Sequence, residues 1–163
     1  MRFIKLGILS FIILFVVITC ISFFIPAHIR ISKAINIHSS CDSLFGPIDD
    51  LHRWSTWNPF IMNASSVTIS GDSTATAGSV NISWKQKQGN QHTAQMENEN
   101  GRKVISGWTC LQHTVQDSIT LQWYMDFHLK WYPWEKFGSL MLERSYGSRM
   151  ELGLSNLKRL LEN

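Results

Sequence analysis

Residues 38–60 read HSSCDSLFGPIDDLHRWSTWNPF and form a short helical insertion between segments that are patterned as strands. Its apolar side chains recur at helical spacing, and its serines can cap a helix N-terminus. Gly46 and Pro47 should interrupt such a helix. We therefore expect two short helices, one near residues 41–45 and one near residues 48–54.

The same stretch ends with Trp54 and Trp57, followed by Asn58 and Pro59. A spacing of three places both indoles on neighbouring sides of one helical turn. Proline then ends the turn, because it pushes the residue before it toward an extended conformation. We expect Trp54 to fasten this turn to a sheet and Trp57 to border a cavity.

Upstream, residues 28–37 read HIRISKAINI, with isoleucine at every second position except where Lys33 interrupts the apolar face. This alternation predicts a half-buried strand. Residues 6–25 before it read LGILSFIILFVVITCISFFI and carry no charge. As a helix, this run would be roughly 30 Å long, which matches the hydrocarbon core of a bilayer.

The apolar run is longer than the core of a cleaved signal peptide, and no Ala-x-Ala cleavage pattern follows it. We therefore expect residues 1–26 to be an uncleaved anchor and residues 27–163 to be one domain. The short N-terminus with Arg2 and Lys5 favours an N-terminus in the cytoplasm. The expected product is a single-pass protein of the inner or plasma membrane, with its domain outside the cytoplasm.

After residue 60 the pattern has period two, with hairpin signals at Gly89-Asn90 and Asn100-Gly101. The residues at 71–78 (GDSTATAG) indicate a loop. The most polar strand, near residues 91–100, is expected to be solvated or at a sheet edge. Together with residues 28–37, the expected strands lie near residues 66–71, 78–86, 91–100, 102–113 and 118–131.

The last segment has a helical period. One apolar stripe is expected to be widened by Leu152 and Leu160, while Gly147 and Gly153 allow close approach to a sheet. The stripe consists of Met150, Leu154, Leu157 and Leu161. The order of elements predicts an α+β fold: a curved antiparallel sheet of six to seven strands around a long C-terminal helix, preceded by one transmembrane helix.

Three stretches resemble the START-like, or Bet v 1-like, helix-grip superfamily, in its polyketide-cyclase and lipid-transport branch. They are residues 24–60, with an anchor, a proline, a strand and a W-x-x-W-x-P ending; GSVNISWK at residues 78–85; and ELGLSNLKRLLE at residues 151–162. The resemblance is greatest to bacterial members with one N-terminal transmembrane helix. It implies a cavity between sheet and long helix that takes hydrophobic molecules or lipids, and it implies no shared catalytic machinery.

Composition excludes several kinds of site. All 12 acidic residues and all 15 basic residues except Arg2 and Lys5 follow the apolar run, so the domain is near neutral and no nucleic-acid partner is expected. No histidine or cysteine spacing indicates a metal, and no motif indicates a cofactor. Cys41 and Cys110 are expected to be buried free thiols, or a disulfide if the domain is exported.

Polar candidates for catalysis are few. Asp126 and His128 share one face of a strand and are the candidate acid/base pair, although a solvated strand face is the simpler interpretation. Asp49 and Asp50 are expected to be solvated carboxylates.

The seven tryptophans are the main functional signal. They can fill a core or line a cavity, since each buried indole N–H needs an acceptor. The expected ligand-binding residues are Trp54, Trp57, Trp84, Trp108, Trp123, Phe127 and Met150. The sequence KWYPWEKF at residues 130–137 also suits a membrane interface.

The expected function is a membrane-anchored domain that binds a hydrophobic small molecule or lipid. One alternative is a protein-interaction or sensing module with a filled core, and another is a cyclase- or hydrolase-type enzyme. For ligand carriage, a cavity of at least roughly 300 Å³ is expected. Oligomeric state is left open.

Overall fold

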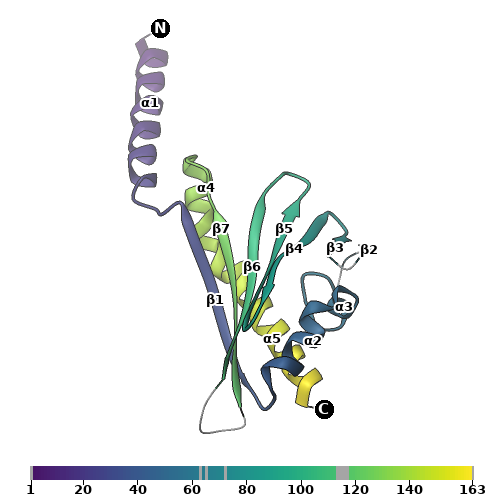
Figure 1. Cartoon of the computed structure of the whole chain (residues 1–163). Coiled ribbons are helices and arrows are strands. Elements are labelled where there is room, and N and C mark those ends of the chain that lie inside the picture. Colours follow the sequence, from purple (N-terminus) through teal and green to yellow (C-terminus); the bar gives the residue numbers. More distant parts are fainter. Residues whose placement is uncertain (1, 63, 65, 72, 113–117, 163) are drawn as a thin grey trace.

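The structure is a computed structural model that describes residues 2–62, 64, 66–71, 73–112 and 118–162. Figure 1 shows an apolar helix, α1, projecting away from an α+β domain. The elements are α1 (Arg2–Ser22), β1 (His28–Ile37), α2 (Cys41–Asp49), η1 (Leu51–Arg53), α3 (Trp54–Trp57), β2 (Val67–Ser70), β3 (Thr74–Ala77), β4 (Val80–Gln88), β5 (Gln91–Asn98), β6 (Lys103–Gln112), β7 (Ile119–His128), α4 (Pro133–Gly138), η2 (Ser139–Met141), η3 (Glu143–Gly147) and α5 (Ser148–Glu162).

The seven strands form one antiparallel sheet in the order β1-β7-β6-β5-β4-β3-β2. The C-terminal helix α5 packs against β1, α2 and α3, so the sheet and the short helices enclose it on several sides. On β7, alternate residues are buried on the face of the sheet that carries the helices, whereas His128 is exposed. The buried residues are Leu121, Trp123, Met125 and Phe127. The α+β helix-grip prediction is therefore confirmed, with seven strands.

Two expectations about the sheet are wrong. The predicted loop contains β3, in which Ala75 and Ala77 are buried and which pairs with both β2 and β4. Small side chains give little hydrophobic signal, so only pairing with neighbours shows this strand. The polar strand β5 lies inside the sheet, between β4 and β6, because His92, Ala94 and Met96 alternate onto the buried face.

The predicted helix break at Gly46-Pro47 is also wrong, because α2 continues through Pro47 to Asp49. The hydroxyl of Ser40 caps its N-terminus by accepting a hydrogen bond from the backbone N–H of Ser43. Leu44, Phe45, Pro47 and Ile48 are buried. Tertiary packing of this side outweighs the hydrogen bond that a proline removes from a helix.

The apolar stripe of α5 is narrower than predicted. Met150, Leu154 and Leu157 are buried, whereas Leu152 and Leu160 are exposed. Leu152 lies two positions from both Met150 and Leu154, which places it on the opposite side of a helix with 3.6 residues per turn.

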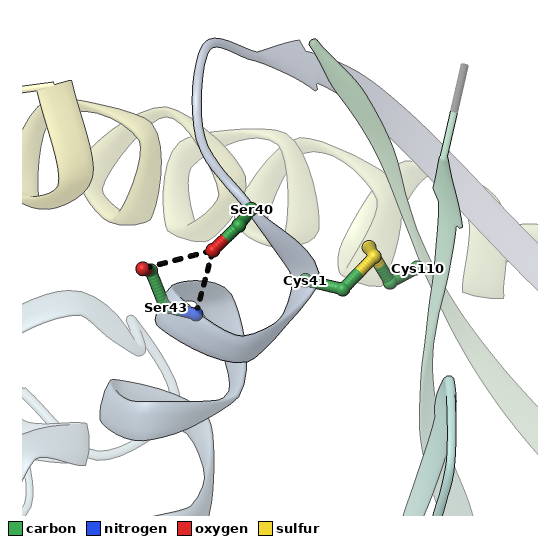
Figure 2. The surroundings of a disulfide bond; sticks show 4 residues. All are labelled: Ser40, Cys41, Ser43 and Cys110. Carbon is green, nitrogen blue, oxygen red and sulfur yellow. Dashed lines mark hydrogen bonds between the residues drawn. A yellow bond between two sulfur atoms is a disulfide. The ribbon is translucent and has the colours of Figure 1, made fainter. Parts of the chain in front are cut away.

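Cys41 and Cys110 form a disulfide that joins the start of α2 to β6 (Figure 2). Their Cα atoms are 5.9 Å apart, within the range that a disulfide spans. The expectation of two free thiols is therefore wrong. The helix N-terminus lies over the sheet, which brings together residues 69 positions apart in the chain.

In the part of the chain that is described, α1 is the helix with the length and composition of a membrane span. Phe3–Ser22 has a mean hydropathy of 2.7, and an 18-residue apolar window within it has no residue buried in the domain. A signal sequence near an N-terminus would have the same properties.

Candidate functional site

Five indoles form a continuous cluster between the sheet and the short helices. Neighbouring ring centroids lie between 5.2 and 6.3 Å apart, mostly in edge-to-face arrangements. This geometry is favoured by the aromatic quadrupole. The members are Trp54 and Trp57 of α3, Trp84 of β4, Trp108 of β6 and Trp123 of β7.

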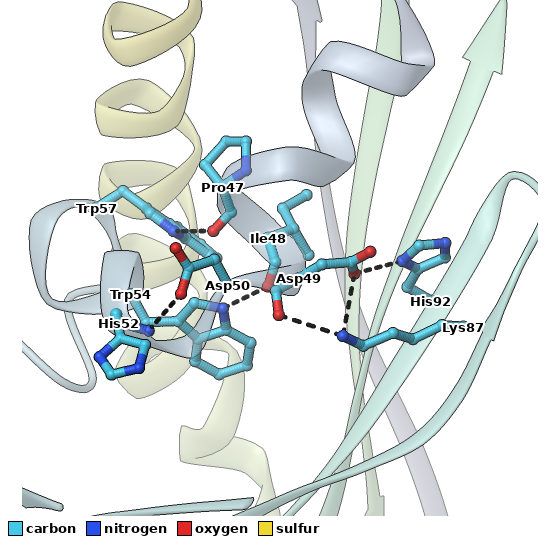
Figure 3. Close-up of polar contacts among 9 residues, drawn as sticks. All are labelled: Pro47, Ile48, Asp49, Asp50, His52, Trp54, Trp57, Lys87 and His92. Carbon is cyan, nitrogen blue, oxygen red and sulfur yellow. Dashed lines mark hydrogen bonds and ion pairs between the residues drawn. The ribbon is translucent and has the colours of Figure 1, made fainter. Parts of the chain in front are cut away.

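Two of these indoles bond to the end of α2 (Figure 3). The indole N–H of Trp54 donates to the carbonyl of Ile48, and that of Trp57 donates to the carbonyl of Pro47 at 3.1 Å. The last carbonyls of a helix have no partner within the helix, so these indoles supply the missing donors. Trp57 is fully buried like Trp54. Both residues fasten the turn, and the predicted place of Trp57 at a cavity rim stays a prediction.

The remaining indole nitrogens differ in their partners. Trp123 donates to the hydroxyl of Ser106 at 2.7 Å. Among the described residues, the buried indole nitrogens of Trp84 and Trp108 have no hydrogen-bond partner. An unpaired buried donor costs free energy, so an acceptor from a ligand or water would be stabilised there.

An apolar cavity of about 230 Å³ lies beside this cluster, between the sheet and the segment that leads into α5. It is smaller than the 300 Å³ expected for carriage. Asn98, Arg102 and Arg149 contribute its polar groups. Its other lining residues are Phe60, Ile61, Ala77, Val80, Ile82, Met96, Val104, Met125 and Tyr146.

The predicted ligand-binding residues do not line this cavity. The five indoles lie in the packed cluster, and Met150 is fully buried on α5. Phe127 lines a neighbouring cavity of about 200 Å³, and its ring meets Tyr146 edge-to-face at 4.8 Å. Direct contact of these seven side chains with a ligand stays a prediction. The lining residues on β4 and β5 alternate along each strand, but nothing in their types distinguishes them from ordinary core residues.

A polar cluster joins the end of α2 to β4 and β5 (Figure 3). The Nδ1 atom of His92 is 2.6 Å from a carboxylate oxygen of Asp49, and Lys87 donates to the backbone carbonyl of Asp49 at 3.2 Å. The His92 ring stacks on Phe45 and meets Trp84 edge-on. Asp49 is thus paired rather than simply solvated, and it borders a cleft of about 310 Å³. Sequence reasoning missed this pair because its members are 43 residues apart.

The candidate acid/base pair lies on the outer face of the sheet, away from the cavity. Arg30 donates two hydrogen bonds of 2.7 Å to the carboxylate of Asp126. These bonds, and the positive charge of Arg30, lower the pKa of Asp126 from its ordinary value despite its burial. His28 is 3.6 Å from the same carboxylate, and its ring centroid lies 4.7 Å from that of His128. The arrangement suits an ionised, structural carboxylate.

Lys33, which interrupts the apolar face of β1, joins two carboxylates. Its ammonium lies 2.8 Å from Glu143 and 2.8 Å from Glu151. These hydrogen bonds raise the pKa of Lys33 above its ordinary value. No group of histidine, cysteine or acidic side chains within the described residues is arranged to hold a metal ion.

No protein-family profile matches the sequence, and no curated protein matches it. Solved structures do match. A START superfamily protein from Mycobacterium smegmatis is 17% identical, with a TM-score of 0.60 over 82% of this chain and 97% of that chain. A norcoclaurine synthase from Thalictrum is 11% identical, with a TM-score of 0.58 over 82% of this chain and 94% of that one.

The di-domain ARO/CYC protein BexL is 12% identical, with a TM-score of 0.62, over 84% of this chain and 51% of that chain. At such identities the likeness concerns the fold, which supports many functions. The part of the chain that follows α1 has the START-like, Bet v 1-like helix-grip fold.

Proposed function

We propose that residues 1–26 are a retained single-pass anchor and that residues 27–163 bind a small hydrophobic molecule, or one acyl chain of a lipid, in the 230 Å³ cavity. The supporting observation is the apolar wall of this cavity, which has Arg102 and Arg149 among its few polar groups. A site of this kind binds by burial of apolar surface, with a few polar groups that orient the ligand. Its volume favours a ligand smaller than a whole phospholipid.

We also propose that the domain lies outside the cytoplasm, in a single-pass protein of the inner or plasma membrane. The disulfide between Cys41 and Cys110 supports this location. Disulfides persist in oxidising compartments and are rare in the cytosol.

A second candidate function is an interaction or sensing module. The observation that favours it is the indole cluster, because four of its five indoles are fully buried and leave little space between the sheet and the short helices. These four are Trp54, Trp57, Trp108 and Trp123. An enzymatic role for Asp126 and His128 has no such support, since Arg30 holds Asp126 on the face of the sheet that is opposite the cavity.

Binding of the fluorescent fatty acid parinaric acid tests the carrier proposal on the full chain in detergent. Energy transfer from the indole cluster reports occupancy. We expect Val104→Phe, which fills the cavity, to weaken binding at least about tenfold, a loss of about 1.4 kcal/mol. The matched control is Leu111→Phe, an exposed position near the other end of the same strand.

Equal binding by both variants would place the fatty acid outside this cavity. Absence of saturable binding to the unmodified chain would instead favour the interaction module.

A further inference from the structure

An exposed apolar stripe runs along α4 and η2. Pro133, Lys136 and Ser139, at spacings of three, are buried against the domain. Trp134, Phe137 and Met141, at spacings of three and four, face outward and are exposed. Both sets follow the helical period, so this segment is amphipathic with its apolar side turned away from the core. We call Trp131, Trp134, Phe137 and Met141 the α4 surface.

The α4 surface lies beside the end of α1. The side chain of Lys136 is buried, and its ammonium donates a 2.7 Å hydrogen bond to the carbonyl of Ile25, three residues after the end of α1. Ser22, in the last turn of α1, is almost fully buried, and α1 contacts α4. Figure 1 shows α4 alongside the lower end of α1. This bond and these contacts hold α4 next to the end of the apolar helix.

We propose that the α4 surface docks onto the bilayer that holds α1, which seats the domain on the membrane. The proposal rests on the retained anchor proposed above. If the hydrocarbon core covers Phe3–Ser22, then α4 lies at the level of the lipid headgroups. Tryptophan and tyrosine concentrate at this level, because their rings are apolar and their polar atoms reach water. Trp131 and Trp134 are 63% and 64% exposed, and Tyr132 stacks on Trp134.

Docking of the α4 surface would place the cavity close to the bilayer, because the cavity lies at the end of the sheet that adjoins α1. At this end His28 pairs with His128, and Val104 pairs with Phe127, the residue before His128. The cavity occupies this end, with Arg102 in the turn between β5 and β6 and Arg149 at the start of α5. A single-chain amphiphile could therefore pass from the membrane into the cavity while its anionic headgroup stays near Arg102 and Arg149.

Fluorescence quenching of the full chain in phosphatidylcholine vesicles tests this docking. The quencher is phosphatidylcholine brominated near the headgroup end of its acyl chains. We expect quenching of the unmodified chain, and loss of most of that quenching in Trp131→Phe with Trp134→Phe, which removes the reporters but keeps their apolar character. We expect Phe137→Glu with Met141→Glu to lose at least about half of the quenching, because charges are costly at this depth.

The matched control is Leu111→Glu with Leu152→Glu, two exposed leucines outside the α4 surface, which should be quenched like the unmodified chain. Equal quenching of the reporter variant and the unmodified chain would overturn the docking proposal. So would an unquenched chain whose Trp131 and Trp134 are shielded from iodide, since a second copy would then cover the surface. Vesicle flotation separately reports the anchor, and parinaric acid binding reports the cavity.

Discussion

The ionisation state and the role of Asp126 depend on a residue that is distant in the chain. Its position on one strand face with His128 is readable from the alternation of residues 118–131. Its role is not, because Arg30, which binds it, lies 96 residues earlier in the chain. Pairing of β1 with β7 places Arg30 directly opposite Asp126. The carboxylate is therefore ionised and held, rather than free to exchange a proton at neutral pH.

Replacement of Asp126 by Asn should make stability less dependent on pH in acid. The folded-state pKa of Asp126 lies below its ordinary value, so the carboxylate stabilises the fold above about pH 4. This contribution disappears as the pH falls through the folded-state pKa. At pH 7 we expect Asp126→Asn to lower the free energy of unfolding by about 1–3 kcal/mol, measured by urea unfolding in detergent.

The difference between the two chains should narrow below about pH 4. The control is Glu99→Gln, an exposed carboxylate, which should change stability little at any pH. A difference that stays constant down to pH 2 would contradict an electrostatic role for Asp126.

At the scale of elements, the approach of α5 to the sheet depends on a missing side chain. A Cβ atom on Gly153 would lie 2.7 Å from Cζ3 of Trp123 and 2.9 Å from Cδ of Pro59. Helical periodicity predicted α5, and the glycine indicated a close contact. The contacting residues were not predictable, since they come from β7 and from the turn that follows α3.

We expect Gly153→Ala to destabilise the domain by about 1–3 kcal/mol, because the added methyl group must displace a buried indole and a proline ring. The measurement is the urea midpoint of the full chain in detergent. Gly138→Ala is the matched control: no atom lies within 4 Å of its added Cβ, so better helix propensity should leave stability equal or up to about 1 kcal/mol higher. Similar losses in both variants would show that helix geometry, not contact, is responsible.

At the scale of the whole molecule, the disulfide ties the short helices to the sheet. It closes a loop that spans 69 positions and includes α2, α3 and strands β2 to β5. We expect Cys41→Ser with Cys110→Ser to lower the free energy of unfolding by about 2–4 kcal/mol, because the unfolded chain regains the entropy of that loop.

Thiol labelling of the denatured chain checks the pairing. Without reductant we expect only Cys20 to react, and after reduction all three cysteines should react. Three reactive thiols before reduction, in protein taken directly from cells, would argue for a reducing compartment and against the proposed location of the domain.

By itself, the sequence determined the order and type of most elements, because period two and period 3.6 report which local face is buried. It also indicated the apolar helix α1, since a run of twenty uncharged residues is a local property. The tertiary structure alone decided that α2 continues through Pro47, that β3 forms, and that Trp57 is buried. It also decided which side chains border the cavity. These features depend on contacts between segments that are distant in the chain. Such contacts determine whether an indole on the buried face of the sheet packs in the core or lines the cavity.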